Sequence, residues 1–298
     1  GGGPGRYAIE LAQQGYQVTL FDLSPGNLAL ARSNVAEAGV TLTAIEQGTA
    51  TDLSRFADDS FDAVLLMGPL YHLLTEAERR QAIAEARRVL KPGGPLFAAF
   101  IARYAAHSDA ATKFLLEPVE RPGLYERIEE TGLLPPGENE GFAAYFARAE
   151  EAAGLCWDAG LEVRALLNVE GLVAGKEHYG LNQLTGAAWA WWEELNWRLA
   201  AEPSLLAAAQ HYLVVSVKPR WRRLLADIVR QCRAAGIRVR AVGGTALALH
   251  GLPIPVKDID LDLDTAGIYR FGELFADHTV QPVGRSENVP YRSHFGRF

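Results

Sequence analysis

The sequence lacks several features that would assign it quickly to a class of protein. It has only two cysteines, Cys156 and Cys232, and they lie too far apart to suggest a disulfide framework or a metal site. A reducing, cytoplasmic setting is therefore expected. No run approaches the roughly 20 apolar residues that cross a bilayer. The most apolar run, AVLLMGPLYHLL, is interrupted by glycine, proline and histidine, so no membrane partner is expected.

The sequence also lacks an excess of positive charge. Its formal net charge is −7, which disfavours nucleic acid as a partner because such binding depends on neutralisation of phosphates by Lys and Arg. About half of the 298 residues are apolar (49%) and 22% are charged, a composition typical of soluble globular proteins. A chain of this length can hold one large domain or two ordinary ones.

From residue 6 to about residue 90, the pattern alternates between helix and strand. Ser24 is placed to cap one helix, and Thr75 with Glu78 forms the signature of a capping box at another. Such short alternating units predict an α/β fold with a doubly wound parallel sheet. Strands are expected at residues 16–22, 40–47, 61–68 and 95–102, and helices at 6–15, 24–39 and 75–90.

The rest of the chain continues less regularly. Residues 104–150 contain several prolines and are expected to be mostly loops. After them we expect a helix at 145–160, strands at 161–171 and 210–219, and a tryptophan-rich helical stretch at 187–209. The tryptophans could form an aromatic lid over a flat substrate, but packing against the sheet is the favoured interpretation.

Pro219 marks the start of a second pattern, so we place a domain boundary near Lys218. An amphipathic helix is expected at 220–236, followed by a strand, a short helix and an acidic strand at 258–264. The predicted domains are therefore residues 1–218 and 219–298.

The first candidate site is a glycine-rich turn. Gly1, Gly3 and Gly5 directly precede a helix, where they allow a tight turn and close approach of a ligand to the backbone. Asp22 ends the next strand, where a carboxylate can accept the hydroxyls of a ribose. This order favours a nucleoside-containing cofactor over a flexible leader. A dinucleotide fingerprint would need glycine at position 6, where this chain has Arg6.

Residues 1 to about 218 resemble class I S-adenosylmethionine-dependent methyltransferases. The segments GGGPGRYA, FDLSP, FDAVLLMGPLYHL and ARRVLKPGG match the successive motifs of that family in order and spacing. The resemblance implies a Rossmann-like sheet whose first strand is missing, and methyl transfer to a small molecule. It also implies cofactor contacts for Gly1, Gly3 and Gly5 on the methionine side, Asp22 on the ribose, Leu23, Thr49 and Ala50 at the adenine, and Gly68 near the sulfonium.

Two side chains are candidates for catalysis. Methyl transfer is an in-line displacement, so alignment and desolvation supply much of the acceleration. Tyr71 and His72 are placed where a substrate could meet the methyl group, and His72 could serve as a general base for a hydroxyl nucleophile. A purely structural histidine is the competing interpretation. Thr49 stands where the family has an acid, which removes one expected contact to the adenine amine.

The second candidate site lies in the C-terminal region. Gly243, Gly244 and Thr245 separate an expected strand from a helix, and Asp258 and Asp260 begin an acidic series that alternates along an expected strand. Carboxylates on one face favour Mg²⁺, although a solvated acidic edge strand is the alternative. This stretch resembles the nucleotidyltransferase superfamily. The resemblance implies nucleotide phosphate on Gly243, Gly244 and Thr245, with Mg²⁺ on Asp258 and Asp260.

Both resemblances break off at an end of the chain, so we interpret the sequence as a fragment truncated at both ends. The acid expected before Gly1 is absent, and the later acids Glu273, Asp277 and Glu287 do not lie on an expected strand. Three functions stay open: a methyltransferase fused to a nucleotidyltransferase-like domain, a nucleotidyltransferase as the main activity, and a non-catalytic binding or antitoxin-like module.

Overall fold

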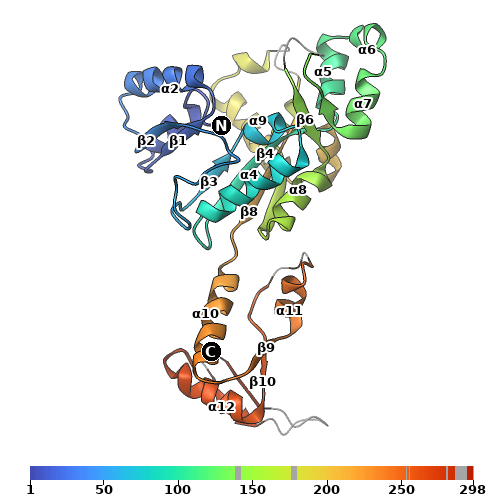
Figure 1. The fold of residues 1–298 in the computed structure, drawn as a ribbon. Helices are drawn as coiled ribbons and strands as arrows, with labels where there is room; N and C mark the ends of the chain where they lie inside the picture. Colours follow the sequence, from blue (N-terminus) through green and yellow to red (C-terminus); the bar gives the residue numbers. More distant parts are fainter. Residues whose placement is uncertain are drawn as a thin grey trace. The chain divides into compact units, whose positions relative to one another are not determined.

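The computed structural model describes residues 1–137, 142–175, 180–252, 254, 256–279, 281–285 and 294–297. Figure 1 shows the path of the chain. It divides into two compact units, residues 1–218 and residues 219–298, which are described separately below. Within the described residues, no helix has both the length and the apolar character needed to cross a membrane.

The first unit begins with two helices and two parallel strands. They are α1 (Arg6–Gln13), β1 (Thr19–Asp22), α2 (Pro25–Glu37) and β2 (Ala44–Gln47). The start of α2 is as predicted, because the Ser24 hydroxyl accepts a hydrogen bond from the Asn27 amide at 3.2 Å and Pro25 occupies the first turn. Leu20 on β1 packs with Leu28 and Ala31 on α2.

The main sheet of the first unit is mixed, with parallel pairs in its centre and antiparallel pairs toward both edges. Its strands are β3 (Val64–Leu66), β4 (Pro95–Ala102), β5 (Leu133–Leu134), β6 (Ala144–Ala147), β7 (Glu162–Asn168) and β8 (His211–Val217). Strand β4 pairs in parallel with β3 and β6, whereas β8 runs antiparallel to both β4 and β7. The predicted α/β class is confirmed, with antiparallel strands added to a parallel centre.

Two helices pack against one face of this sheet (Figure 1), and residues of two others cluster with Ile101 and Phe146 on the opposite face. The helix α4 (Glu76–Val89) begins with the predicted capping box, in which Thr75 and Glu78 satisfy each other's backbone amides. It packs near α8 (Ala149–Asp158). Alternate residues of β4 are buried, and Leu96 and Phe100 are fully enclosed between sheet and helices. This core includes Leu66 at the end of β3, which leads to the first site.

The segment predicted to be mostly loops contains regular structure instead. It forms α5 (Ala105–Lys113), α6 (Glu117–Glu120), α7 (Leu124–Thr131), β5 and β6. The prolines are poor indicators of a continuous loop here. Pro118 lies in the first turn of α6 and Pro122 lies between two helices, and proline is tolerated at both positions. The helix predicted at 145–160 is also wrong at its start, since residues 145–147 belong to β6 and the backbone is still extended at Arg148.

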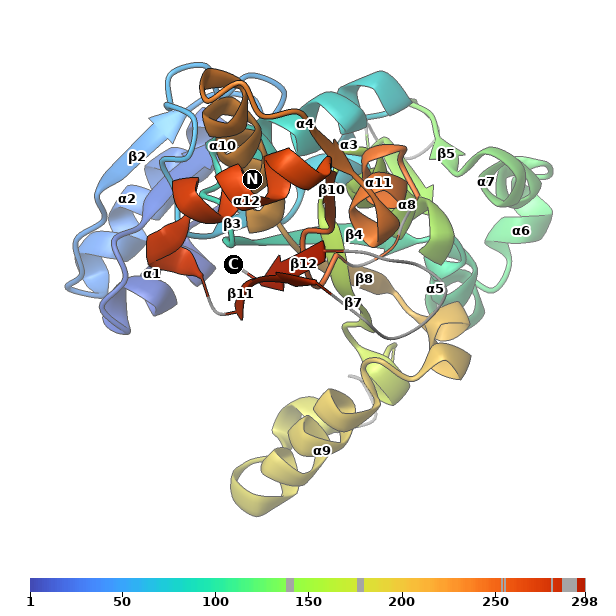
Figure 2. The ribbon, with the colours of Figure 1, turned by 90° about the horizontal axis from the view of Figure 1, so that it is seen from below.

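A long excursion separates β7 from β8. It includes the short 3₁₀ segments η1 (Gly171–Val173), η3 (Leu181–Gln183) and η4 (Pro203–Ala208), and the tryptophan-rich helix α9 (Gly186–Leu199). None of the residues of α9 is fully buried, and Figure 2 shows this helix projecting away from the main sheet.

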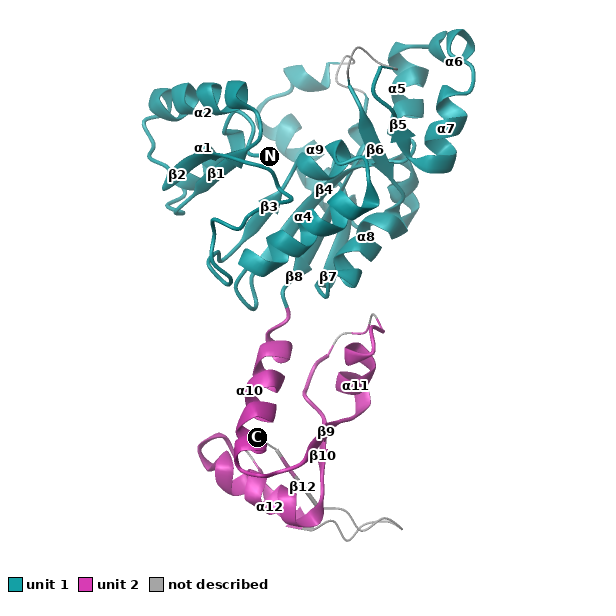
Figure 3. Ribbon diagram, in the orientation of Figure 1, with its two compact units in different colours: residues 1–218 teal, residues 219–298 magenta. Residues whose placement is uncertain are grey.

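The second unit is small and mixed (Figure 3). It contains α10 (Arg220–Ala234), β9 (Val239–Ala241), α11 (Gly243–Leu249), β10 (Leu261–Leu263), α12 (Thr265–Leu274), η5 (Ala276–His278), β11 (Gln281–Arg285) and β12 (His294–Arg297). Strands β9 and β10 are antiparallel, as are β11 and β12. Cys232, Ile237, Phe271 and Phe275 form its buried cluster.

Candidate functional site

The glycine-rich turn lies between the carboxyl ends of β1 and β3. The Gly2 amide donates to the Phe21 carbonyl at 2.9 Å, and a Cβ atom added at Gly2 would lie 2.6 Å from Leu20 Cγ. A Cβ at Gly1 would lie 2.9 Å from the Met67 carbonyl oxygen. Only glycine therefore fits where the turn meets both strands. In open α/β sheets, ligands bind at such a place beyond the carboxyl ends of the strands.

The outer side of the turn is open to an incoming molecule. Gly3 and Gly5 have φ angles of 51° and 90°, which favour glycine, and no atom lies within 4 Å of a Cβ position at Gly3. Helix α1 starts immediately after Gly5. Backbone atoms of the turn can thus be approached closely by a ligand at the start of a helix.

Asp22 faces this turn. Its carboxylate accepts the Gly3 amide at 2.8 Å and the Ser24 amide at 2.9 Å, and only 7% of the residue is exposed. Burial by itself would raise the pKa of Asp22, but the hydrogen bonds from Ser24 and Gly3 outweigh burial and hold the pKa below its usual value. The group is therefore a carboxylate at neutral pH, and its oxygens have acceptor capacity beyond the two backbone amides.

An apolar side chain and a short loop flank Asp22. Leu23 is 67% exposed, as a residue that covers a flat ring would be. The Gly48 amide donates to the Asp22 carbonyl at 3.0 Å, which brings the loop that follows β2 to the same edge. The Thr49 hydroxyl is 2.9 Å from the Thr51 hydroxyl, so it bonds locally, and Ala50 packs against the core.

The loop after β3 brings Tyr71 next to the glycine turn. Gly68 has a φ of 113° and precedes α3 (Pro69–His72). A Cβ at Gly68 would lie 3.7 Å from the Tyr71 hydroxyl and 3.9 Å from Gly1. Burial, together with the nearby Tyr7, raises the pKa of Tyr71. Tyr71 is consequently a neutral hydroxyl at neutral pH, suited to donate a hydrogen bond and not to accept a proton.

His72 lies on the exposed side of the same helix. Its ring is 4.8 Å from the Tyr71 ring and 5.7 Å from the Phe142 ring, measured between centroids. The structure thus brings together Gly1, Gly3, Gly5, Asp22, Gly68 and Tyr71, with His72 at their margin. Their roles in binding and catalysis stay predictions.

The sequence analysis missed a histidine and a glutamate at this edge of the sheet. His211 begins β8, and its ring centroid lies 6.3 Å from that of Tyr71. Glu170, after β7, contacts the His211 Nδ1 at 2.6 Å and accepts the His211 backbone amide at 2.9 Å. The two residues are 41 positions apart and meet only because β7 and β8 pair, so no local spacing reveals them.

A cavity of about 220 Å³ lies beside these residues, and we call it the acceptor cavity. It is bounded by β4, α5 and α7, and His211 forms part of its wall. Its lining consists of Ile101, Ala105, Ala106, Asp109, Phe114, Glu117, Arg121, Leu124, Tyr125, Ile128, Leu134, Phe142, Phe146, Gln210 and His211.

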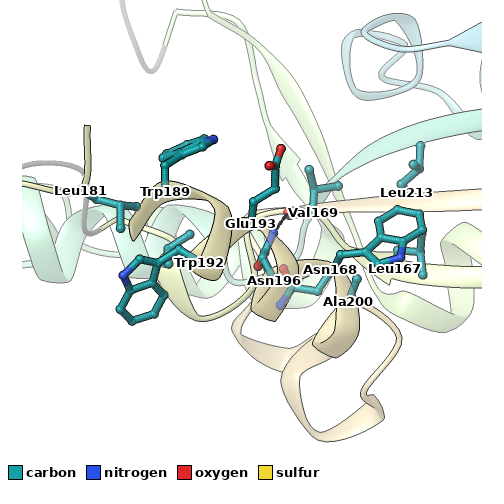
Figure 4. Close-up of a pocket in the computed structure, with 12 residues that line it drawn as sticks. Leu167, Asn168, Val169, Leu181, Trp189, Trp192, Glu193, Asn196, Ala200 and Leu213 are labelled. Carbon is teal, nitrogen blue, oxygen red and sulfur yellow. Dashed lines mark hydrogen bonds between the residues drawn. The ribbon is translucent and has the colours of Figure 1, made fainter. Parts of the chain in front are cut away.

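A second cavity of about 370 Å³ lies along α9 (Figure 4). Trp189, Trp192 and Trp197 line it together with residues of β7 and β8. The Asn196 side chain donates to the Val169 carbonyl at 2.8 Å and so ties the helix to the end of β7. Three of the tryptophans thus border a cavity beside the sheet edge, and Trp191 is 58% exposed.

In the second unit, the buried Thr245 ties the glycine step to the acidic segment. Its hydroxyl donates to the Asp258 carbonyl at 3.2 Å and accepts the Asp260 amide at 3.0 Å. The Asp260 carboxylate lies over the start of α11, since a Cβ at Gly243 would be 2.6 Å from its Oδ2. Gly244 is open on its outer side.

The predicted acidic strand at 258–264 is wrong in extent. Only Leu261–Leu263 pairs with β9. Asp258 and Asp260 therefore precede the strand and do not share a pleated face with Asp262 and Asp264. Asp262 pairs with Arg240, and Asp264 caps α12. Of the later acids, Glu273 lies in α12 and Asp277 in η5, while Glu287 is outside the described residues. No group of three metal-binding side chains occurs among the described residues.

The N-terminal part of the chain is similar to known methyltransferases. Residues 1–94 match the family model of a methyltransferase domain. The glycine/sarcosine N-methyltransferase of Parasynechococcus marenigrum is 37% identical over 95 residues, which cover 32% of this chain and 33% of the relative. The ubiquinone biosynthesis O-methyltransferase of Paracidovorax citrulli is 32% identical over 163 residues, covering 55% and 61%. The predicted resemblance to methyltransferases is thereby supported for residues 1–94, and the predicted extent of the domain, residues 1–218, stays a prediction.

Among solved structures, a S-adenosylmethionine-dependent methyltransferase of Methanosarcina mazei is similar, with a TM-score of 0.49 and 22% identity. The alignment covers 74% of this chain and 90% of that one. The chain spans less than two thirds of the length of the curated relatives just described.

Proposed function

We propose that residues 1–218 bind S-adenosylmethionine and transfer its methyl group to a small molecule. The observation that carries this proposal is the Asp22 carboxylate, held in its ionised form and facing the open glycine turn. A ribose bound across Gly3 would meet the remaining acceptor positions of Asp22. Leu23 would cover the adenine, and the backbone at Thr49 and Ala50 would border it.

The chemistry asks this chain mainly to orient two molecules and to exclude water. The donor supplies an electrophilic methyl group on a cationic sulfur. Gly1 and Gly68 lie close enough together to border that end of the donor, and Tyr71 can donate a hydrogen bond beside them. Alignment of this kind supplies much of the acceleration of a displacement reaction.

Titration calorimetry with S-adenosylmethionine on the full chain tests the proposal. We expect binding by the wild type and at least a tenfold weaker affinity for Asp22→Ala, because a hydrogen bond to a charged group contributes roughly 1.5–3 kcal/mol. Glu37→Ala, an exposed acid at the end of α2, is the matched control and should bind like the wild type. Absence of binding at millimolar donor, or unchanged affinity of a folded Asp22→Ala chain, would contradict the proposal.

A second function is proposed for residues 219–298, a Mg²⁺-dependent nucleotidyl transfer. The contacts of Thr245 with the segment 258–260 support it, because they hold the Asp260 carboxylate against the glycine step. Asp258 and Asp260 would bind Mg²⁺, and the backbone of Gly243 and Gly244 would border the nucleotide phosphates. Carboxylate oxygens are suitable ligands for this ion.

Pyrophosphate release from ATP, with and without Mg²⁺, tests the second function. We expect release to be lost in Asp260→Ala and kept in Asp277→Ala, an exposed acid of η5. Equal release by the two variants would argue against the assignment. Binding of both ligands without any turnover would instead favour the non-catalytic module.

A further inference from the structure

We propose that His211, positioned by Glu170, is the general base for methylation of a neutral phenol of one ring, which occupies the acceptor cavity. This inference rests on the proposed methyl transfer by residues 1–218. It adds the class of acceptor and the residue that takes its proton. Four independent features of the structure support it, and each is given in turn.

The first feature is the fixed geometry of the His211 and Glu170 pair. One oxygen of Glu170 lies 2.6 Å from His211 Nδ1, and the other accepts the His211 backbone amide at 2.9 Å. Both the ring and the backbone of His211 are therefore held by one carboxylate. With Nδ1–H donated to Glu170, Nε2 is left as the acceptor, and the carboxylate stabilises the imidazolium that forms when Nε2 takes a proton.

The second feature is the position of the pair between the glycine turn and the acceptor cavity. The Tyr71 hydroxyl lies near Gly68 and Gly1, and the Tyr71 ring centroid is 6.3 Å from that of His211. His211 in turn lines the cavity. Tyr71 thus lies near both the glycine turn and His211, so a phenolic oxygen beside Tyr71 would have the donor on one side and the base on the other.

The third feature is the size and lining of the acceptor cavity. Its volume is about 220 Å³, and a cavity of about 150 Å³ is known to hold benzene. One six-membered ring with small substituents therefore fits. Phe114, Phe142 and Phe146 contribute aromatic surface, and Ile101 and Ile128 contribute aliphatic surface. Such walls suit a flat apolar ring.

The fourth feature is the pairing of the charged groups that face the cavity and the pair of His211 and Glu170. Glu117 binds Arg121 at 2.7 Å and accepts the Tyr125 hydroxyl at 2.6 Å. Asp109 pairs with Lys113 at 2.9 Å and lies 3.5 Å from Gln210. With Arg121 engaged by Glu117 and with acids close by, the lining suits a neutral acceptor better than an acidic one.

The proposed step is balanced within these groups. As the phenolic oxygen forms its bond to the methyl carbon, its proton passes to His211 Nε2. The bond between that carbon and sulfur breaks, and its electron pair stays on sulfur, which becomes a neutral thioether. The imidazolium is stabilised by Glu170 and later releases its proton to water.

The experiment uses 4-nitrophenol, whose ionised form absorbs visible light and can be measured without any methyl donor. At a pH near the midpoint of the free probe, we expect binding to the wild-type chain to increase the phenolate signal. His211→Gln should bind the probe without that increase, and Glu170→Gln should give a smaller increase than the wild type.

His250→Gln, on the exposed surface of the second unit, is the matched control. Ala106→Phe, which places a large side chain in the cavity lining, should abolish probe binding.

With donor present, general-base catalysis predicts a loss of turnover of at least 100-fold for His211→Gln. The same phenolate signal in the wild type and His211→Gln would overturn the proposal, and so would binding unaffected by Ala106→Phe. Faster methylation of 4-nitroaniline than of 4-nitrophenol would overturn the phenol assignment. If the donor does not bind but the phenolate signal is intact, the proposed methyl transfer is contradicted and the role of His211 as a base is retained. Failure of the proposed function can therefore be distinguished from failure of this inference.

Discussion

At the scale of single residues, Arg103 is a buried cation held by several partners. Only 2% of its side chain is exposed, and its guanidinium donates to the carbonyls of Phe146 and Glu129 and to the Glu151 carboxylate. Glu151 also accepts the Tyr145 hydroxyl at 2.7 Å and the Arg148 amide at 2.8 Å. A buried charge of this kind is stable only while its partners remain in place.

We predict that Glu151→Gln lowers the free energy of unfolding by about 2 kcal/mol at neutral pH, because charge-assisted hydrogen bonds contribute roughly 1.5–3 kcal/mol and Glu151 is partly exposed. Burial alone would raise the pKa of Glu151, but the contacts with Arg148, Tyr145 and Arg103 hold it below the usual 4.5. The stabilisation is therefore complete above about pH 4.5 and is lost as pH falls through the lower, folded value.

Urea denaturation at a series of pH values measures this effect. The difference in free energy of unfolding between the wild type and Glu151→Gln should become smaller as the solution becomes more acidic than pH 4.5. Glu150→Gln, the neighbouring exposed acid, serves as the control. A difference that widens on acidification would contradict the assignment.

Residue roles that depend on neighbours in sequence could be predicted, and those that depend on distant pairing could not. Ser24 and Thr75 act on amides three positions away, so their capping spacing is visible in the chain. Asp22 is a candidate from its place at the end of a strand. Glu170 and His211 are 41 positions apart, and their contact exists only once β7 pairs with β8.

At the scale of elements, α7 offers a direct test of how glycines bound a helix. Gly123 precedes it and Gly132 follows it, with φ angles of 84° and 75°. A Cβ at Gly123 would meet no atom within 4 Å, whereas a Cβ at Gly132 would lie 2.5 Å from the Phe146 carbonyl oxygen. Both positions disfavour other residues through φ, but only Gly132 is also restricted by space.

We predict that Gly132→Ala destabilises the first unit by about 1–3 kcal/mol more than Gly123→Ala does. The shared cost of a positive φ cancels between the two variants, and the remainder is the cost of overpacking against β6. Chemical denaturation followed by circular dichroism measures both. Equal stabilities of the two variants would show that the contact between Gly132 and β6 relaxes at no cost.

Element types were predictable where the pattern was long, and least so where prolines and short strands dominate. The helices α2 and α4 follow from apolar periodicity and capping. The helix α6 was missed because proline at a helix start resembles proline in a loop. The acidic strand was overextended because alternation continues beyond the three residues that pair.

At the scale of the whole molecule, each compact unit contains one buried thiol. Cys156 lies in the core of the first unit and Cys232 in that of the second, and both are fully enclosed. Burial raises the pKa of Cys156 to about 12 and also raises the pKa of Cys232. The thiolate is the reactive form, so both groups should be inert in the folded chain.

We predict that thiol labelling by a disulfide reagent in the native chain is at least about 100-fold slower than in the denatured chain, because it requires opening of the unit that holds the cysteine. In increasing urea, the labelling rate of Cys156 in the Cys232→Ala variant should report opening of the first unit. The labelling rate of Cys232 in the Cys156→Ala variant should report opening of the second unit. Rapid labelling of either variant in the absence of urea would show that its unit is not closed around the thiol.

Helix α9 has a consequence for spectroscopy. It holds Trp189, Trp191, Trp192 and Trp197, four of the six tryptophans of the chain, and leaves none of them fully buried. Intrinsic emission is thus dominated by one surface helix and is quenched readily by solutes such as acrylamide. A compound that enters the cavity beside α9 should shift that emission to the blue and protect it from quenching, which gives a label-free readout of this cavity in the unmodified protein.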